Sequence, residues 1–389
     1  MKFMHVADLH LESPFKGMLG NDMPNQLNKD ILNSTFDSFA SVVKDAINEK
    51  VDFLLIVGDL FDSDNPSPKA KLFLQEQFEK LNEFDIPVFM SYGNHDYHSN
   101  ELGIYPKNVY VFPDKVTNKI VQIKNKSVGI CGFSYTDKWI DAIKINDYPI
   151  KSNVDYQIGM FHGDDATESH YANFSVNQLL SKNYNYWALG HIHKRQQLNA
   201  NPPIWYSGNT QGRHQNESGD KGYLIIDTDT NKVQFNATSK INWSNLELQL
   251  DNMSEMQLIQ VILNAIIKQG FKKMNLLKLD IYFQKLPQLS NDDLLEMLQD
   301  NLKDKYQDLN AWVYNINFRS VKNNFNLIGD KYWKLTQDNV FNIDNISDSA
   351  SSLFKYSFIK EYFSKHDNIS ELNQLSKNIL MGDEMKGDE

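Results

Sequence analysis

The run from Phe53 to Asp62, Phe-Leu-Leu-Ile-Val-Gly-Asp-Leu-Phe-Asp, constrains the fold of this chain more than any other stretch. Its first five residues are continuously apolar, which is typical of a strand buried on both faces. Gly58 permits a sharp turn directly after that strand. Asp59 then lies at the carboxyl end of the strand, where open α/β sheets hold their ligands. Because a buried carboxylate is costly unless it meets a cation or several donors, the run predicts a strand that ends in a site.

The first third of the chain alternates apolar strands with amphipathic helices. This β-α-β-α-β pattern predicts parallel strands joined by right-handed crossovers. From residue 109 to residue 236 strands dominate, with one helix at about 175–181. Strand runs mixed with helices predict two sheets packed on each other with helices outside. The early elements are expected at 2–7, 53–57 and 86–92 for strands, and at about 28–49 and after Pro68 for helices.

The chain, at 389 residues, is too long for one typical core, and its rhythm changes after about residue 243. A linker is expected near Ile241–Leu250, followed by a helix-strand-helix-strand pattern of a small α+β unit. After residue 330 the composition turns polar, with scattered aromatic positions that either dock on a partner or pack back on the core. We expect a main domain at 1–243, an α+β cap domain at 244–330, a C-terminal helical partner-docking segment at 331–381 and a disordered acidic tail at 382–389.

The composition is that of a cytoplasmic globular protein. The single cysteine, Cys131, excludes an intramolecular disulfide framework and fits a reducing compartment. The apolar stretch at Met1–Asp8 is too short for a signal peptide and gives way early to polar residues. No stretch has the apolar length of a membrane span. We therefore expect a cytoplasmic location and no membrane contact.

The net charge of −11 argues against a dedicated nucleic-acid scaffold, which usually carries a basic field. Arginine is scarce, with only Arg195, Arg213 and Arg319. If the substrate is a nucleic acid, either metal ions together with a local lysine patch or a partner must supply the attraction.

Five short blocks rich in Asp, His and Asn each follow a predicted strand. A single strand-end Asp or His is more often a cap than a ligand, but five such blocks in one chain are hard to obtain by chance. Residues two apart on extended backbone point the same way, so a block can direct two side chains to one site. Imidazole, carboxylate and amide donors together suit a pair of borderline divalent cations such as Mn, Fe or Zn. The blocks are Asp8-x-His10, Gly58-Asp59-x-x-Asp62, Gly93-Asn94-His95-Asp96, His162-Gly163 and Gly190-His191-x-His193.

These blocks resemble the signature of the calcineurin-like metallophosphoesterase superfamily, and the resemblance covers about residues 1–236. Asp8-Leu9-His10, Gly58–Asp62 and the later Ser207-Gly208-Asn209 are most similar to the DNA-exonuclease branch typified by bacterial SbcD. The run Gly208–His214, with Glu217, Gly219, Lys221 and Gly222, resembles YhaO-type members of that branch. The resemblance implies a four-layer αββα fold, in which two sheets form a sandwich flanked by helices.

The resemblance also implies roles for the block residues. One metal ion would be bound by Asp8, His10, Asp59 and His193, and the second by Asp59, Asn94, His162 and His191. Both ions would be divalent, with manganese preferred and iron or zinc as alternatives. A hydroxide bridging the two metals would attack the phosphodiester, while His95 assists the leaving group and Asp62 orients His95 through its second nitrogen.

Other polar residues are assigned less specific roles. Arg195, Arg213 and His214 are candidate contacts to the substrate, with a solvated surface role as the alternative. Asp96 is expected to be a structural cap, and His5, which faces inward from the first strand, a hydrogen-bonded core histidine.

The resemblance implies a metal-dependent nuclease, a hydrolase that cleaves DNA as an SbcD-like exonuclease in DNA repair. It also implies a homodimer and a partner ATPase of the SMC-like coiled-coil kind. A phosphodiesterase acting on a cyclic nucleotide remains an alternative, because the site chemistry fits many phosphoesters. A non-catalytic platform that binds DNA or the ATPase remains another. A phosphoprotein phosphatase is disfavoured, since Ser63-Asp64 follow Asp62 where such enzymes carry an arginine.

Overall fold

The computed structural model divides the chain, by its internal contacts, into the units Met1–Arg319 and Ser320–Glu389. In the second unit the described residues include helices α8 (Ile343–Ser349) and α9 (Ser357–Phe363). The acidic tail expected at 382–389 lies outside the described residues. None of the helices in the described part of the chain has the length and apolar character needed to cross a bilayer. The structure describes residues 1–15, 23–97, 105–166, 169–250, 253–284, 286–287, 289–320, 341–349, 354, 357–363, 368–370, 372–373 and 376.

The first unit contains two six-stranded sheets, called here the first and second sheets. The first has the order β12-β11-β1-β2-β3-β4, and β1 to β4 are parallel, as the alternating pattern predicted. Its strands are β1 (Lys2–Val6), β2 (Phe53–Val57), β3 (Val88–Ser91), β4 (Val109–Val111), β11 (Gly222–Asp227) and β12 (Lys232–Ala237). The second has the order β5-β6-β7-β8-β10-β9, in which β6, β7, β8 and β10 are parallel. Its strands are β5 (Thr117–Ile123), β6 (Lys126–Gly132), β7 (Tyr156–His162), β8 (Tyr186–Gly190), β9 (Gln196–Ala200) and β10 (Pro203–Tyr206).

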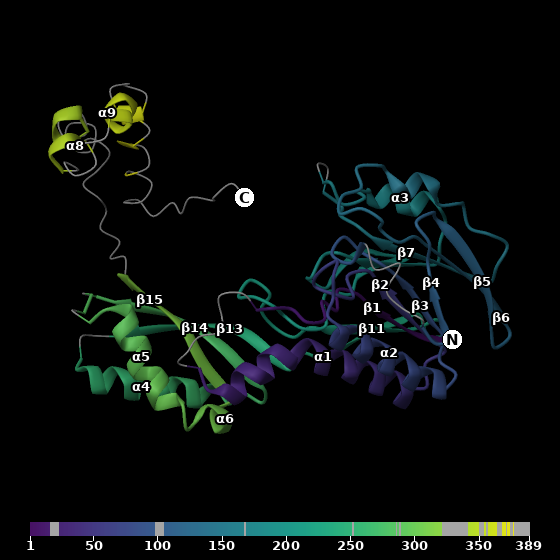
Figure 1. Ribbon diagram of the computed structural model, residues 1–389, viewed down its shortest axis with the longest axis horizontal. Coiled ribbons are helices and arrows are strands. Elements are labelled where there is room, and N and C mark those ends of the chain that lie inside the picture. Colours follow the sequence, from purple (N-terminus) through teal and green to yellow (C-terminus); the bar gives the residue numbers. More distant parts are fainter. Residues whose placement is uncertain are drawn as a thin grey trace. The chain divides into compact units, whose positions relative to one another are not determined.

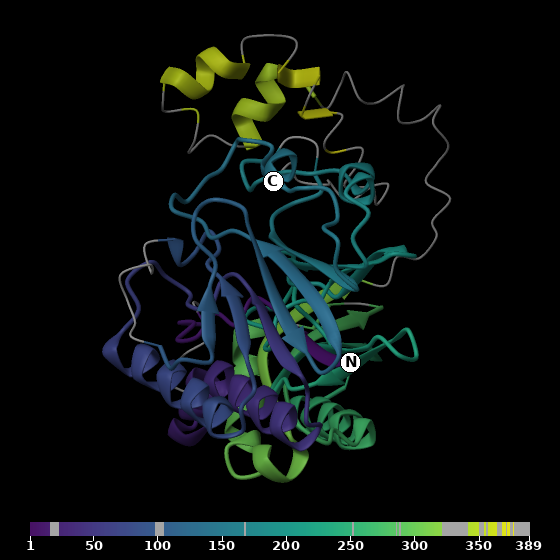
Figure 2. The ribbon, with the colours of Figure 1, turned by 90° about the vertical axis from the view of Figure 1, so that its right-hand side faces the viewer.

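The two sheets pack face to face because their central strands are apolar on both sides. In β2, Phe53, Leu55 and Val57 contribute to the core between the sheets, whereas Leu54 and Ile56 contribute to the core under the helices. Helices α1 (Asn25–Asn48) and α2 (Pro68–Glu83) lie side by side over the outer face of the first sheet (Figure 1 and Figure 2). Helix α3 (Val176–Ser181) and the 3₁₀ helix η2 (Lys144–Asp147) cover the outer face of the second. The four-layer αββα fold is therefore confirmed.

Local signals fix where the helices begin. The Ser67 side chain accepts a hydrogen bond from the Ala70 main-chain N–H at the start of α2, and Pro68 occupies its first position. At α3 the side chains of Ser175 and Gln178 form a reciprocal capping box. These caps satisfy main-chain donors in the first turn of each helix.

A third sheet of three strands, in the order β13-β14-β15, follows the sandwich. The stretch expected to be a linker is instead β13 (Ile241–Leu250), which pairs in parallel with β14 along its whole length. The reason is its apolar alternation, since Leu246, Leu248 and Leu250 all contact or join one core with the helices of this sheet. The other elements are β14 (Met274–Phe283), β15 (Ala311–Ser320), α4 (Glu255–Gln269), α5 (Asn291–Leu302) and α6 (Tyr306–Leu309).

Helix α1 belongs to two cores at once. Its first turns contribute Leu27 and Ile31 to the core of the third sheet. Phe36 and Phe39 pack against the outer face of the first sheet. Figure 1 shows α1 running from the small sheet to the sandwich. The sandwich and the third sheet therefore share one continuous helix.

His5 lies between the two large sheets, with its side chain fully buried. Its Nδ1 is 3.0 Å from the Tyr186 hydroxyl and its Nε2 is 3.0 Å from the Leu189 carbonyl oxygen. The expectation of a hydrogen-bonded core histidine is confirmed. Burial lowers the pKa of His5 to about 3.

This buried histidine predicts a stability loss in mild acid. An unfolded chain protonates histidine near a pKa of about 6.5, whereas folded His5 stays neutral down to about 3. The stability that a neutral His5 contributes is therefore fully present above the unfolded pKa of about 6.5. It is lost progressively as the pH falls from that value toward the folded pKa of about 3. Between about pH 7.5 and about pH 5.5 we expect His5 to lower the free energy of unfolding by about 1.4 kcal/mol. Urea unfolding of the wild type and of His5→Gln at both pH values measures it; equal losses in the two proteins would exclude His5 as the source.

Candidate metal centre

The five blocks meet at one edge of the sandwich. Strands β1, β2 and β3 are parallel, as are β7 and β8, so the carboxyl ends within each sheet lie together. The two sheets touch at this edge, because His162 Nδ1 donates to the Val57 carbonyl oxygen at 3.0 Å. The His191 main-chain N–H donates to Asp8 Oδ1, also at 3.0 Å. The edge therefore combines donors from both sheets.

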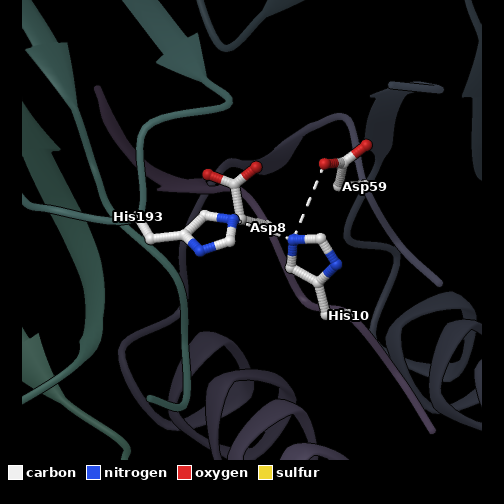
Figure 3. Close-up of side chains that lie close together, drawn as sticks. All are labelled: Asp8, His10, Asp59 and His193. Carbon is white, nitrogen blue, oxygen red and sulfur yellow. Dashed lines mark hydrogen bonds and ion pairs between the residues drawn. The ribbon is translucent and has the colours of Figure 1, made fainter. Parts of the chain in front are cut away.

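The first ligand set assigned from the sequence comes together as expected. One ligand atom from each of Asp8, His10, Asp59 and His193 lies within 4.8 Å of the others. Figure 3 shows the two imidazoles facing each other, with the two carboxylates beside them. The His10 and His193 Nε2 atoms are 2.9 Å apart, and His10 Nε2 is 3.6 Å from Asp59 Oδ2.

The second set converges on the side-chain oxygen of Asn94. His162 Nε2 lies 3.0 Å from Asn94 Oδ1, and His191 Nδ1 lies 3.1 Å from the same atom. Asp59 Oδ1 is 3.5 Å from His162 Nε2, so the Asp59 carboxylate reaches both sets, one oxygen toward each. This is the arrangement that a bridging carboxylate requires.

The donor set fits divalent cations, because ring nitrogens, carboxylate oxygens and an amide oxygen face one another at short distances. His162 Nδ1 donates to a carbonyl and His193 Nδ1 lies 2.6 Å from a Glu217 carboxylate oxygen. The Nε2 atom of each ring is therefore the one directed to the centre, where it would offer a lone pair to a bound cation. Burial, with the nearby Arg213 charge, lowers the pKa of His10 well below its ordinary value, and burial with His162 lowers the pKa of His191 to about 4. Such neutral imidazoles beside carboxylates suit Mn, Fe or Zn.

Asp59 and His162 each change the ionisation of the other. Burial opposes ionisation of Asp59, but the adjacent His162 holds the pKa of Asp59 well below its ordinary value. Burial likewise opposes a charged His162, yet Asp59 raises the pKa of His162 to about 9. A cation that binds His162 Nε2 therefore displaces a proton.

The backbone of the centre has positive φ at four of the ligand candidates. Asp8, His10, Asp59 and His191 have φ values of 52°, 43°, 51° and 98°. Non-glycine residues adopt this region only at a cost, and such strain clusters at functional sites. The cost is offset by main-chain hydrogen bonds between the two blocks, from Asp8 N–H to the Gly58 oxygen and from His10 N–H to the Asp59 oxygen.

Two glycines allow the ligands to approach. A Cβ on Gly58 would lie 2.1 Å from His162 Nδ1, and a Cβ on Gly93 would lie 2.2 Å from Asp59 Oδ1. Neither distance is possible for a real side chain, so the glycines of these blocks are required by packing as well as by the turn.

His95 lies beside the centre, but its contact with Asp62 differs from the one expected. Its Nδ1 is 3.1 Å from the main-chain oxygen of Asp62, so the carbonyl and not the carboxylate orients the ring. The Asp62 carboxylate is engaged elsewhere: it forms an ion pair with the Arg213 guanidinium and lies 3.3 Å from His10 Nδ1. Asp62 therefore contacts the second nitrogen of His95 through its main-chain oxygen, although its carboxylate lies in the same group with His10 and His95.

Asp96 is a structural cap, as expected. Its carboxylate accepts main-chain N–H groups of Leu60 and Gly93, both at 2.6 Å, and ties the second block to the third. Burial, with the Asp59 charge, raises the pKa of Asp96 to about 7.

Glu217 has a place in the centre that sequence reasoning did not assign. Its Oε1 lies 2.6 Å from His193 Nδ1, and Oε2 accepts the Arg213 main-chain N–H at 2.7 Å. Burial opposes its charge, but the hydrogen bond from His193 and the contacts with Arg213 hold the pKa of Glu217 at about 2. It fixes the ring of His193 as outer carboxylates do for metal-bound histidines. The only signal was its position in the Gly208–Gly222 run, which does not reveal the partner.

The three weaker substrate candidates separate in the structure. Arg213 is drawn into the centre and is mostly buried, with 15% of its side chain exposed. His214 is half exposed, with Nε2 3.0 Å from Glu217 Oε1. Arg195 is exposed, and its guanidinium instead stacks over the ring of Phe235, 3.7 Å from the ring centroid.

Comparison with known proteins agrees with this geometry. Residues 1–195 match the calcineurin-like phosphoesterase family. The chain is 36% identical over 284 residues to the metallophosphoesterase YhaO of Bacillus subtilis, a match that covers 69% of each protein. It is 28% identical over 258 residues to the DNA double-strand break repair protein Mre11 of Methanocaldococcus jannaschii, covering 62% of this chain and 66% of that protein. Mre11 of Methanococcus maripaludis is 24% identical over 382 residues, covering 83% of this chain and 96% of that protein.

This chain therefore belongs to the calcineurin-like phosphoesterase family, as the five blocks predicted. It is a metal-dependent phosphoesterase, and its clustered carboxylates, imidazoles and amide fit the pair of divalent cations that such enzymes use.

Gly93→Ala should disable the centre. The new methyl group would collide with the Asp59 carboxylate, at 2.2 Å from Oδ1, and Asp59 reaches both ligand sets. We expect divalent-metal affinity to fall at least about tenfold, the lower range seen when ligand orientation is lost. Calorimetric titration of chelator-treated protein with Mn²⁺ measures this.

Gly270→Ala is the matched control. Gly270 ends α4 with φ 59°, and a Cβ at this position would have no neighbour within 4 Å. Alanine there costs about 1–2 kcal/mol of stability, because of the left-handed backbone, without touching the centre. Equal metal affinity in the two variants would contradict the steric argument.

Proposed function

We propose that this protein is a DNA phosphodiesterase of the exonuclease type that acts in DNA repair in the cytoplasm. The observation that carries the proposal is the pair of ligand sets that share Asp59, with His95 beside them. The similarity to two archaeal Mre11 proteins, whose names assign them to DNA double-strand break repair, favours DNA over other phosphodiesters.

Two divalent ions would be held by the two sets. Asp8, His10, Asp59 and His193 would bind one, and Asp59, Asn94, His162 and His191 would bind the other. We propose Mn²⁺ as the resident ion, with iron or zinc compatible with the same donors. When bound, such a pair activates water and neutralises the charge that develops on the phosphoryl group.

His95 is proposed to protonate the leaving oxygen. The Asp62 carbonyl can only accept, so the proton of the neutral ring lies on Nδ1, and Nε2 is the nitrogen that exchanges a proton with substrate. The His95 main-chain N–H donates to Asp59 Oδ1 at 3.0 Å, which fixes the residue relative to both ligand sets. As the phosphorus–oxygen bond breaks, Nε2–H of the imidazolium gives its proton to the departing oxygen.

Arg213 is proposed to hold the phosphate. Its Nη1 pairs with Asp62, while its buried Nε has no hydrogen-bond partner among the described residues. A guanidinium anchored on one side and unsatisfied on the other can donate to a phosphate oxygen. Asp62 would act by positioning this arginine, in addition to orienting His95 through its carbonyl.

We further propose the arrangement of the whole protein. Residues 1–243 would form the nuclease domain and 244–330 the cap, although this boundary falls inside β13. Residues 331–381 would dock an SMC-like coiled-coil ATPase, and the chain would form a homodimer. The exposed Phe358 and Tyr362 of α9 are compatible with such docking.

Removal of His95 should abolish cleavage without removing metal. For His95→Ala we expect a rate on end-labelled linear DNA with Mn²⁺ that is about 10²–10⁴-fold lower, the usual contribution of a positioned acid. Metal content, measured by mass spectrometry, should remain that of the wild type. His170→Ala is the control, because His170 is exposed and pairs with Asp141 outside the ligand sets.

The substrate panel separates the alternatives. Cyclic nucleotides and bis-para-nitrophenyl phosphate are tested beside DNA. Turnover of these small diesters with intact DNA would contradict the DNA proposal in favour of a small-molecule phosphodiesterase. Bound metal without turnover of any of them would favour a non-catalytic platform.

Arg213→Met should reduce the stabilisation of the transition state more than it reduces the affinity for metal. Loss of one preorganised donor to a developing anion typically costs on the order of 100-fold in rate, and we expect that decrease in kcat/KM. Arg195→Met removes the same charge from a residue that stacks on Phe235, and it should change kcat/KM little. Equal effects of the two substitutions would show that arginine acts only through the general charge of the surface.

A further inference from the structure

The loop between β10 and β11, Ser207–Lys221, connects the metal centre with the third sheet. It contains the run that resembles YhaO-type proteins, and the proposed chemistry uses only its Arg213. Its buried members are more numerous than a surface loop requires: Asn209, Thr210, Gln211 and Glu217 are each 6% exposed or less. The contacts of these buried residues lead in two directions, to a metal ligand candidate and to β13.

At the metal centre the loop holds one ligand candidate from two sides. Glu217 Oε1 accepts from His193 Nδ1 at 2.6 Å, and Lys221 Nζ donates to the His193 carbonyl oxygen at 3.0 Å. Both the ring and the main chain of His193 are therefore set by this loop.

Inside the loop, the Glu217 carboxylate is tied to the backbone. Its Oε2 accepts the Arg213 main-chain N–H and Asn209 Nδ2, each at 2.7 Å. Because these bonds fix the carboxylate, a shift of the peptide around Gly212 and Arg213 must move Glu217 and, with it, the His193 ring.

At the third sheet the same peptide is held by Trp243 of β13. The indole Nε1 donates to the Gly212 carbonyl oxygen at 3.0 Å, and Trp243 is 2% exposed. A Cβ on Gly212 would lie 2.7 Å from the Glu217 main-chain oxygen and 3.2 Å from Trp243 Cδ1, so no slack exists between the two. Tyr314 of β15 packs on Trp243 with ring centroids 5.4 Å apart, and its hydroxyl lies 3.4 Å from Gln215 Oε1.

We propose that Trp243 is a positioning residue for His193 and that the loop transmits the position of the third sheet to the metal centre. The path is short and continuous: Trp243 Nε1 to the Gly212 oxygen, along one peptide to Arg213 N, then to Glu217 and His193. A macromolecule that displaces the third sheet thereby changes the affinity of the ion that His193 binds. The inference rests on the metal centre and not on DNA as substrate.

Trp243→Phe tests the proposal, because phenylalanine keeps an aromatic ring but lacks the donor. Outer partners of metal ligands contribute about 10–100-fold to affinity, and Trp243 acts two hydrogen bonds further out than the outer partner Glu217. In calorimetric titrations of chelator-treated full-length protein, we expect one Mn²⁺ binding step to weaken by about 3- to 10-fold and the other to stay unchanged. Glu217→Gln, which alters the direct partner of His193, should show the larger effect on the same step.

Trp312→Phe is the matched control in the same sheet. Trp312 is 1% exposed and its ring packs against Tyr306 of α6. Equal Mn²⁺ affinities in Trp243→Phe and Trp312→Phe would overturn the proposal. If Trp243→Phe fails to fold by circular dichroism, Tyr314→Phe removes the second contact, and wild-type affinity in that variant would overturn it.

Linkage supplies a readout that needs no substitution. If the sheet affects the ion, the ion must affect the sheet by the same free energy. Mn²⁺ should slow hydrogen exchange of the wild-type segments 211–217 and 241–250, and the slowing of 241–250 should disappear in Trp243→Phe. Unchanged exchange of 241–250 on Mn²⁺ addition to the wild type would exclude the coupling.

Discussion

The structure depends on one buried carboxylate, that of Asp59, at the edge where two apolar sheets meet. Its side chain is 1% exposed and lies within 3.6 Å of imidazole nitrogens from both sheets. Burial works against its charge, and the adjacent His162 keeps its pKa well below the ordinary value. Three features hold this carboxylate beside the histidines. They are the space left by Gly58 and Gly93, the left-handed backbone of Asp59, and the hydrogen bond from the His95 main-chain N–H.

Positive charge is supplied at the metal centre itself, although the chain as a whole is acidic. It carries a net charge of −11 and only three arginines, yet one of them is directed into the centre. Arg213 neutralises Asp62 on one side of the donor set, where Asp8 and Asp59 already concentrate negative charge. The cationic character that a phosphodiester requires is therefore supplied by a few fixed groups and by the ions, and not by the surface as a whole.

Topology made much of the site readable from the sequence. Residues that follow parallel strands must meet at the carboxyl edge, so Asp8, Asp59 and Asn94 could be placed together once the strands were recognised. What could not be read is which atom of a residue makes a contact. Asp62 offers its carbonyl to His95 and its carboxylate to Arg213, and these two partners lie 33 and 151 positions away. The strand β13, by contrast, carried a local signal, because Leu246, Leu248 and Leu250 alternate with polar residues in the stretch that was expected to be a linker.

Helix α1 gives the first unit a property that neither core has alone. Because Leu27 and Ile31 are fully buried with the third sheet while Phe39 is fully buried with the sandwich, melting the helix exposes both cores together. Without the third sheet, Leu27 and Ile31 of α1 would be exposed to solvent. Such an apolar surface promotes self-association. The two cores are thus joined into one cooperative folding unit, and during synthesis the N-terminal half of α1 must wait for its partner strands, which emerge more than 200 residues later.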